Sequence, residues 1–387
     1  MTGKVTARLA DSAAAIGAEA WNACANPQGL ALPDPFLRHE FFAALEQSGS
    51  ATERTGWMPC HLVIENDGRI DGLMPLYLKR HSQGEYVFDH SWAEAFARAG
   101  GRYYPKLQCS VPFTPVTGQR LLIRPDAPQE ETRSALFAAG ATAVNQLQAS
   151  SLHITFLTEQ EWKDAGALGY LQRTDQQFHW LNEGYDSFDQ FLGALSSSKR
   201  KNLRKERAAV REAGVAFDWL TGSDITEAHW DTFFEFYMDT GGRKWGHPYL
   251  TREFFSRIGE SMSEQVLLII ARLGDRPIAG ALNLFGRGVL FGRNWGCTEY
   301  IPFLHFETCY YQAIDFAIAN KLDRVEAGAQ GEHKLLRGYM PTPTYSAHFI
   351  EHSGLRRAVA DYLAREREAV AEHIEELAEH GPFRKNS

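Results

Sequence analysis

The densest cluster of polar side chains in the sequence is the segment 326–334, which reads Glu-Ala-Gly-Ala-Gln-Gly-Glu-His-Lys. It follows a short stretch at 324–327 that predicts a central strand, so these side chains would lie at the carboxyl edge of a sheet, where open α/β folds bind ligands. Gly328 and Gly331 allow close approach to the backbone or a positive φ. Neighbouring carboxylate and imidazole groups suit proton transfer. An ordinary strand-to-helix turn, with Glu332 near a helix N-terminus, explains the same pattern.

A second polar group lies in the helical stretch predicted at 302–320. His305 and Glu307 are two residues apart and do not share a helix face, so a metal site built from this pair is disfavoured. Glu307 does share a face with Tyr310 and Tyr311, so a carboxylate and a phenol could line a cleft. The alternative is that both tyrosines belong to the core with their hydroxyls satisfied. The sequence shows no Walker loop, nucleophile elbow or metal-binding histidine pair.

The segment from Ser196 to Arg211 predicts one strongly basic helix in a chain whose formal net charge is −8. Seven cations fall between 199 and 211, against a single acid, Glu206. Such a helix can hold an anionic carrier, such as a tRNA end or a phosphorylated lipid precursor, or it can be a solvated face. The candidates for carrier binding are Lys199, Arg200, Arg204 and Lys205.

The composition is that of a soluble globular protein large enough for two domains, with 387 residues, 44% apolar and 23% charged. No apolar run approaches the roughly 18 residues that a membrane helix requires. Asp11 and Glu19 interrupt the alanine-rich stretch after Lys4 and Arg8, which makes a poor signal peptide. The five scattered cysteines fit reduced core thiols, so we expect a cytoplasmic protein. The acidic net charge argues against general affinity for nucleic acid, DNA included.

The chain contains an internal repeat. The pattern P-[FY]-L-x-x-E-F-F occurs at 35–42 and again at 248–255, and the stretch 62–77 reads like 269–285. Several matches in one order indicate two related α/β modules rather than a solenoid of many copies.

We therefore expect modules at residues 1–180 and 181–387, the second ending in a helix. Each module reads as strand, two helices, hairpin, strand, long helix, strand, short helix and strand. The main expected elements are strands at 5–9, 152–157 and 178–180 with a long helix at 128–148, and strands at 215–220, 324–327 and 348–350 with a long helix at 302–320.

This order of elements resembles the acyltransferase fold of the GNAT superfamily, present twice, as in the Fem-like aminoacyl and acyl transferases. Three motifs resemble the bacterial group of FemAB-like predicted N-acyltransferases: Gly-Arg-Asn-Trp-Gly at 292–296, Leu-His-Phe-Glu-Thr-Cys-Tyr-Tyr-Gln at 304–312 and Gly-Ala-Gln-Gly-Glu-His-Lys at 328–334. The resemblance covers almost the whole chain. It implies an α/β (α+β) fold of two tandem GNAT-like modules, each a mixed twisted sheet flanked by helices.

The resemblance also implies a transferase that moves an activated acyl or aminoacyl group to an amine, in a peptidoglycan-related process. The acceptor would be a small-molecule or lipid-linked amine that attacks directly in a cleft of the second module, without a covalent intermediate or a bound catalytic cofactor. Glu332 or His333 would be the base, directly or through a water. Lys334 and Arg337 would neutralise the carrier.

In this fold the strand at 292–296 splays from its neighbour to admit the acyl donor, and a backbone N–H there can stabilise an oxyanion. The pyrophosphate loop of ordinary GNAT enzymes, Q/R-x-x-G-x-G/A, is not evident at 297–302, where Glu299 supplies a carboxylate. The donor therefore stays open between acyl-CoA and aminoacyl-tRNA. The candidates for substrate binding in the second module are Arg293, Trp295, His305, Glu307, Tyr310, Gln330, Lys334 and Arg337.

Between its hairpin and its long helix the first half carries a longer segment, 81–119, rich in aromatic residues, proline and glycine. It is either a substrate-facing loop or a stabilising cap. Its candidates for substrate binding are Asp89, Tyr104 and Lys106.

The rival class of function is a non-catalytic binding protein built on a decayed transferase fold. An apolar stripe on the C-terminal helix could dock on a partner as readily as on its own chain. This stripe comprises Leu355, Val359, Leu363, Val370, Ile374 and Leu377.

Overall fold

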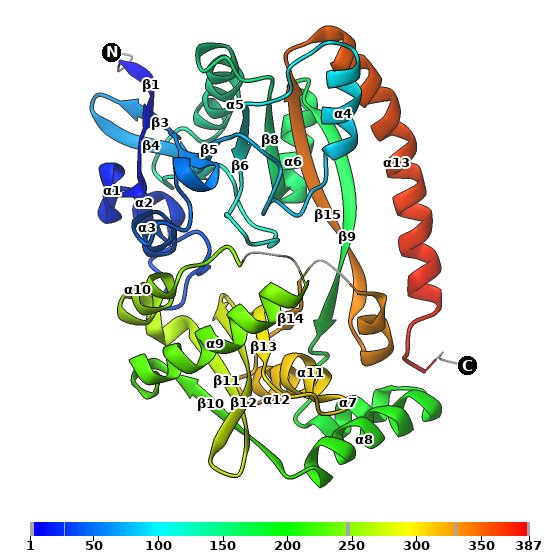
Figure 1. The fold of residues 1–387 in the computed structure, drawn as a ribbon. Helices are drawn as coiled ribbons and strands as arrows, with labels where there is room; N and C mark the ends of the chain where they lie inside the picture. Colours follow the sequence, from blue (N-terminus) through cyan, green and yellow to red (C-terminus); the bar gives the residue numbers. More distant parts are fainter. Residues whose placement is uncertain (1–3, 27, 245–247, 329–330, 385–387) are drawn as a thin grey trace. The chain divides into compact units, whose positions relative to one another are not determined.

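The computed structural model describes residues 4–26, 28–244, 248–328 and 331–384 (Figure 1). At Glu332 and at 242–244 it describes the backbone alone. No helix in the described part of the chain is both long enough and apolar enough to cross a membrane.

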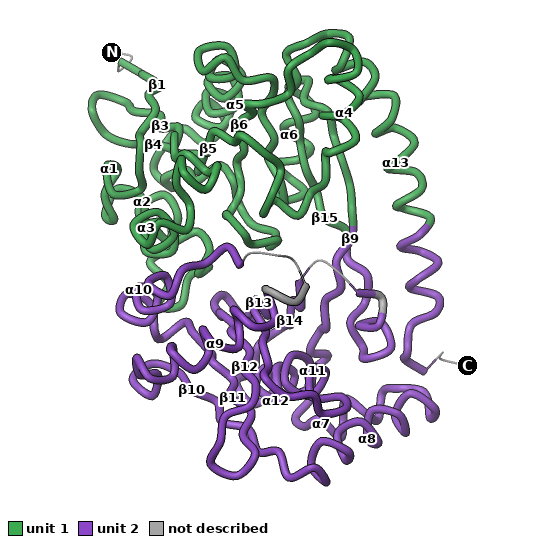
Figure 2. The backbone as a smooth tube through the Cα atoms, in the orientation of Figure 1, with its two compact units in different colours: residues 1–175, 343–372 green, residues 176–342, 373–387 purple. Residues whose placement is uncertain are grey.

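The chain divides into two compact units, shown in green and purple in Figure 2. Unit 1 comprises residues 1–175 and 343–372, and unit 2 comprises residues 176–342 and 373–387. The modules expected from the sequence are defined by the internal repeat and not by compactness, and that division stays a prediction.

Unit 1 contains most elements of the first half of the chain. They are β1 (Val5–Ala10), α1 (Ala13–Ile16), α2 (Ala18–Ala25), α3 (His39–Gln47), η1 (Glu53–Thr55), β2 (Trp57–Pro59), β3 (His61–Asn66), β4 (Arg69–Met74), β5 (Leu76–Lys79), α4 (His90–Arg98), β6 (Lys106–Cys109), β7 (Leu122–Ile123), α5 (Gln129–Gln146), β8 (Ser151–Leu157), α6 (Glu159–Ala167) and the start of β9 (Leu171–Leu181). The strands form a sheet β1-β3-β4-β7 and a second array β15-β8-β6-β5-β2, in which β15 is Met340–Ile350.

The second array of unit 1 has one apolar and one polar face. Side chains alternate along a strand, so Leu152 and Ile154 of β8 lie in a core with Leu107 of β6. The intervening side chains Ser151 and His153 point to the opposite face, yet both are fully buried. Unit 1 therefore buries a polar sheet surface.

Unit 2 contains the elements that follow β9. They are α7 (Phe188–Ala194), α8 (Ser197–Glu212), β10 (Val215–Thr221), η2 (Gly222–Asp224), α9 (Glu227–Lys244), α10 (Arg252–Met262), η3 (Ser263–Gln265), β11 (Val266–Leu273), β12 (Arg276–Gly286), β13 (Val289–Cys297), α11 (Leu304–Phe306), the π-helical turn η4 (Glu307–Tyr311), α12 (Gln312–Ala319), β14 (Arg324–Glu326), the 3₁₀ helix η5 (Glu332–Arg337) and the start of β15 (Met340–Ile350). The strand order is β10-β11-β12-β13-β14-β9.

Each half of the chain gives its closing strand to the sheet of the other half. Residues 179–181 of β9 pair with β14 in unit 2, and residues 345–350 of β15 pair with β8 in unit 1. This exchange explains why the compact units are discontinuous in sequence.

The last helix, α13 (Ser353–Glu379), packs on its own chain. Leu355, Val359 and Leu363 are buried in a cluster with Trp92 of α4. This part of the apolar stripe is therefore not open to a partner.

The internal repeat has equivalent local structures in the two units. Trp21 packs on Phe42 with ring centroids 4.9 Å apart, and Trp230 packs on Phe255 at 5.8 Å. The hairpins β3–β4 and β11–β12 each close with a two-residue turn and carry a bulge. Because Phe42 and Phe255 end the repeated P-[FY]-L-x-x-E-F-F pattern, the shared motif places the same pair of helices in each unit.

Gly296 of β13 lies directly against α9. A Cβ atom at this position would be 2.1 Å from the carbonyl oxygen of Phe236. We expect Gly296→Ala to lower the free energy of unfolding by about 1–3 kcal/mol, because the backbone of α9 must move away. Chemical denaturation measures the change. Gly193→Ala in α7 is the control, because a Cβ there meets nothing within 4 Å, and equal stability of the two variants would contradict the prediction.

Candidate functional site

Strands β13 and β14 pair over a short ladder only. They run parallel and pair at three positions, Val289–Phe291 with Arg324–Glu326. β13 then continues to Cys297 with its other edge paired to β12, and the β12–β13 ladder bulges at Arg293. In the described part of the chain, the edge of β13 beyond Phe291 therefore has no ladder partner in β14. The sequence resemblance expected this strand to splay from its neighbour, and that stays a prediction.

Four of the residues proposed from the sequence gather beside this unpaired edge. The rings of Trp295 and His305 have centroids 5.2 Å apart, and those of His305 and Tyr310 are 5.4 Å apart. The imidazole of His333 lies 6.4 Å from that of His305, and its Nε2 is 3.0 Å from the hydroxyl of Tyr310. We call Trp295, His305, Tyr310 and His333 the aromatic cluster.

His333 has the electrostatics of a neutral base. Partial burial, followed by the positive charges of Arg337 and Lys334, lowers the pKa of its imidazole. The side chain remains exposed. A neutral imidazole hydrogen-bonded to a phenol can accept a proton from a substrate at neutral pH.

Arg337 fixes the turn that carries His333. Its guanidinium lies 3.5 Å from the ring centroid of Phe306 and donates to the carbonyl oxygen of His333 at 2.7 Å. It also donates to both carboxylate oxygens of Glu206, at 2.8 and 3.0 Å. Because the side chain is buried and paired, it positions the aromatic cluster, whereas the sequence analysis proposed it as a partner of the carrier.

Lys334 is a buried lysine at the same place. Its Nζ donates to the carbonyl oxygen of Gly328 at 2.9 Å. Burial lowers the pKa of its ammonium to about 8, and the charge of Arg293 acts in the same direction. The two cations thus lie close enough to influence each other beside the open edge of β13.

The structure does not bring Glu307 to the aromatic cluster. The helix expected at 302–320 contains the π-helical turn η4, which alters the spacing of its side chains. Glu307 is buried and accepts hydrogen bonds from Arg207 and Gln312, each at 2.9 Å, and burial raises the pKa of its carboxyl. The hydroxyl of Tyr310 meanwhile faces His333.

Two proposed residues cannot be placed. Gln330 lies outside the described residues, and so does the side chain of Glu332. The choice between Glu332 and His333 as the base therefore stays a prediction.

The side chains of the basic helix α8 differ in their contacts. Its inward side carries Glu206, which binds Arg337 and Tyr311, and Arg207, which binds Glu307. Arg204, one of the cations proposed for carrier binding, is three residues from Arg207 and so shares its face of the helix. Arg204 makes an exposed 3.5 Å contact with Asp189, and the structure shows no ion pair with described residues for Lys199, Arg200 or Lys205.

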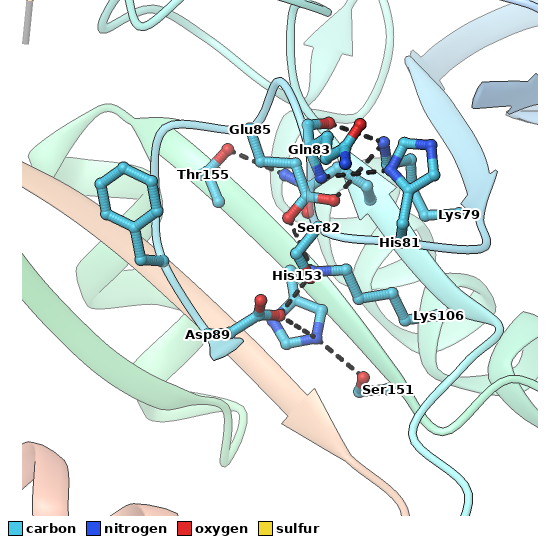
Figure 3. A network of polar contacts seen from close by, with 12 residues as sticks. Lys79, His81, Ser82, Gln83, Glu85, Asp89, Lys106, Ser151, His153 and Thr155 are labelled. Carbon is cyan, nitrogen blue, oxygen red and sulfur yellow. Dashed lines mark hydrogen bonds and ion pairs between the residues drawn. The ribbon is translucent and has the colours of Figure 1, made fainter. Parts of the chain in front are cut away.

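The candidates from the first half belong to a buried charged network in unit 1 (Figure 3). Lys106 of β6 donates to Glu85 at 2.6 Å, to Ser82 at 2.9 Å and to Asp89. Tyr104 is 2.8 Å from the same Ser82 hydroxyl. The structure thus brings Asp89, Tyr104 and Lys106 together in the segment that was expected to be a loop or a cap.

A second lysine, Lys79, balances the charge of the second carboxylate in this network. Lys79 lies opposite Lys106 in the β5–β6 ladder, 3.7 Å from Glu85 and above the ring of Trp57 at 3.5 Å. Burial lowers the pKa of its ammonium to about 7, and the nearby Lys106 charge adds to the decrease. Two lysines and two carboxylates are therefore buried together.

Two histidines extend the network across the polar face of the sheet. His153 and His348 lie opposite each other in the β8–β15 ladder, with their Nδ1 atoms 2.7 Å apart. Ser151 hydrogen-bonds His153 at 2.7 Å. Burial lowers the pKa of His153 to about 3 and that of His348 well below its usual value.

Sequence reasoning missed Lys79, Glu85, His153 and His348. The available signal was the alternation Ser151-Leu152-His153-Ile154-Thr155, which indicates a strand with one polar face. Such a face is normally solvated, and only the structure shows that the segment after β5 covers it.

The network makes stability depend on pH. His153 faces Asp89, Lys106, Arg173 and His348. Because its pKa is about 6.5 unfolded and about 3 folded, the unfolded chain binds more protons between these values, and the free energy of unfolding should fall as pH decreases from 6.5.

Chemical denaturation at pH 7.5 and 5 measures this slope. We expect His153→Gln to have a shallower slope than the wild type, whatever its absolute stability, whereas the exposed His380→Gln should keep the wild-type slope. A wild-type slope in His153→Gln would contradict the assignment.

In the ranges that the structure describes, no three His, Cys, Asp or Glu side chains are grouped so as to hold a metal ion.

Comparisons with known proteins give the family. A model of the FemAB-like family, described as peptidoglycan biosynthesis/recognition, matches residues 12–385. FemX is similar in structure with a TM-score of 0.54 and 12% identity, over 88% of this chain and 98% of FemX. L-PGS from Bacillus licheniformis has a TM-score of 0.51 and 10% identity, over 86% and 98%. A tandem GNAT protein from the clavulanic acid biosynthesis pathway has a TM-score of 0.48 and 10% identity, over 90% and 98%. No curated protein matches the sequence.

The expected mixed α/β fold is confirmed, since FemX shares it over 98% of its own length. At these identities the structural matches show the fold alone, and function has to be argued from the site. The family model spans nearly the whole described chain, and the three motifs that suggested the resemblance all fall within it. The chain belongs to the FemAB-like family, described as peptidoglycan biosynthesis/recognition.

Proposed function

We propose that this protein transfers an activated acyl or aminoacyl group to an amine, and that the reaction takes place beside the open edge of β13 in unit 2. The observation that carries the proposal is the hydrogen-bonded pair of Tyr310 and His333, beside the part of β13 that continues past its pairing with β14. An unpaired strand edge offers backbone groups to a substrate, and the imidazole offers a base. Family membership supports the same reaction class.

The chemistry requires an amine to lose a proton as it attacks a carbonyl carbon. His333 is suited to accept this proton because its lowered pKa keeps the imidazole neutral. Tyr310 orients the ring through its hydrogen bond to Nε2. No covalent intermediate is needed, since holding the amine and the carbonyl in line supplies much of the rate.

The negative charges that develop during the reaction, on the attacked carbonyl and on the carrier, would also be stabilised beside this strand edge. Backbone N–H groups on the open edge of β13 would stabilise the oxyanion that forms on the attacked carbonyl. The C–N bond forms as the bond to the carrier breaks. The cations Arg293 and Lys334, near this edge, would then stabilise the departing carrier anion.

The substrates proposed are those that the family and the charge distribution support. The acceptor is a small-molecule or lipid-linked amine of peptidoglycan-related chemistry, consistent with the family description. The donor is acyl-CoA or aminoacyl-tRNA, both of which are cytoplasmic and anionic, so we place the reaction in a bacterial cytoplasm. Cations of α8, among them Lys199, Arg200 and Lys205, would bind the carrier.

The base can be tested with a generic amine. Acyl-CoA and aminoacyl-tRNA are each incubated with the protein and hydroxylamine, and formation of the hydroxamate is measured. We expect His333→Ala to reduce turnover about 10²-fold with little change in melting temperature, because the side chain is exposed. Tyr310→Phe should reduce turnover less and shift the pH profile of the rate.

Glu332→Gln is measured in the same assay, because it is the other candidate base. His380→Ala, an exposed histidine on α13, is the matched control. Full activity in both His333→Ala and Glu332→Gln would remove this turn as the catalytic centre.

The carrier surface can be tested by charge reversal. Replacing Arg200, Arg204 and Lys205 with Glu should weaken binding of the carrier and flatten its dependence on salt concentration, because fewer ions are released on binding. The control reverses three exposed cations away from α8: Lys321, Arg357 and Arg365. Unchanged affinity and salt slope in the folded α8 variant would leave the helix as a solvated face.

A further inference from the structure

Unit 2 contains a second site apart from the aromatic cluster, although it shares Arg204 with the proposed carrier surface. A cavity of about 730 Å³ opens against α8, and its lining includes neither β13 nor His333. Arg204, Arg207 and Arg211 all line it. These residues are spaced at i, i+3 and i+7, so they form one face of the helix.

Arg207, which lines this cavity, has two carboxylate partners. Arg207 is held by Glu307 at 2.9 Å and by Asp315 at 2.6 Å, so two carboxylates share one guanidinium. Glu307 lines the cavity and is buried, with a side-chain exposure of 5%. Its Oε1 accepts from Arg207 and Gln312, but its Oε2 has no hydrogen-bond partner among the described residues. Such an atom calls for a donor.

Two other arginines, Arg204 and Arg211, also line the cavity. Arg211 is exposed and makes no ion pair or hydrogen bond through its side chain with described residues. Arg204 has only the 3.5 Å contact with Asp189, and both side chains are well exposed, so this pair is weak. Two guanidinium groups are therefore available to an anion.

The lining of the cavity is partly apolar. Phe188, Leu192, Val215 and Phe217 line the cavity together with the charged groups. A ligand that fits must therefore carry a cation at one end, an anion at the other and a short apolar link.

We propose that this cavity binds a phosphorylated primary amine, with the ammonium at Glu307 and the phosphate at Arg204 and Arg211. A phosphate suits two guanidinium groups, since each can donate two hydrogen bonds to it.

The inference goes beyond the proposed function and does not depend on it. Binding at the cavity is measured without turnover. Loss of activity in His333→Ala would leave the cavity unaffected, and failure of the cavity to bind would leave the aromatic cluster unaffected.

Calorimetry with small probes tests the ligand class on the full chain. We expect O-phosphoethanolamine to bind at least tenfold more tightly than inorganic phosphate, which lacks the ammonium. It should also bind more tightly than phosphocholine, which has the same charges but no N–H donor for Glu307. Equal binding of the three probes would overturn the proposal without any variant.

Variants then assign the two ends of the ligand. Glu307→Gln should remove the preference for O-phosphoethanolamine and leave the affinity for phosphate unchanged, because Asp315 still holds Arg207. Arg211→Ala, an exposed and unpaired position, should lower the affinity for both probes about tenfold. Lys201→Ala on the same helix, outside the cavity lining, is the control and should change neither. Wild-type affinities in both Glu307→Gln and Arg211→Ala would overturn the site.

The phosphorylated amine could be free or a lipid head group, and cosedimentation with vesicles distinguishes these sources. Vesicles of phosphatidylcholine with and without phosphatidylethanolamine are compared. Selective binding to phosphatidylethanolamine that Glu307→Gln abolishes supports a lipid head group. Binding of the free probe alone supports a free metabolite.

Discussion

The short pairing between β13 and β14 is the constraint on which the candidate site depends. Parallel strands that stayed paired would satisfy the backbone groups on both facing edges and leave none for a substrate. Here the ladder ends at Phe291, and β13 is kept extended by β12 on its other side. Gly296 lets α9 pack closely on the same strand, so the open edge is held by rigid neighbours. A reacting carbonyl needs this kind of fixed support.

The carboxylate of Glu206 connects the basic helix to this site. It binds the buried Arg337, whose guanidinium in turn binds the carbonyl of His333. Breaking a buried ion pair leaves an uncompensated charge and is costly, so the position of the turn that carries His333 depends on the packing of α8. The next residue, Arg207, joins the same helix to Glu307 and to the second cavity. The π-helical turn η4 contains both Tyr310, which contacts His333 in the aromatic cluster, and Glu307, which lines the second cavity.

Unit 1 shows a different use of buried charge. Lys79 and Lys106 are balanced by Glu85 and Asp89, and every one of these side chains is almost fully buried. A buried ionic network is weak evidence for stability, because desolvation offsets much of the attraction, but it favours one arrangement of the chain over others. Glu85 and Asp89 belong to the segment 81–119 that distinguishes the first half from the second. This network therefore gives that segment a defined position on the sheet.

The sequence by itself determined the internal repeat and the order of strands and helices, because these depend on local spacing, and the fold was expected from a family resemblance. The turns at Asp67-Gly68 and Gly274-Asp275, and the helices at 128–148 and 196–211, come from patterns within a few residues. Tertiary structure alone decided which side chains meet. His153 and His348 are 195 residues apart, and the exchange of closing strands brings them together. The π-helical turn separated Glu307 from Tyr310, although regular helical spacing placed them on one face. Burial of the polar face of β8 required a cover that strand periodicity cannot show.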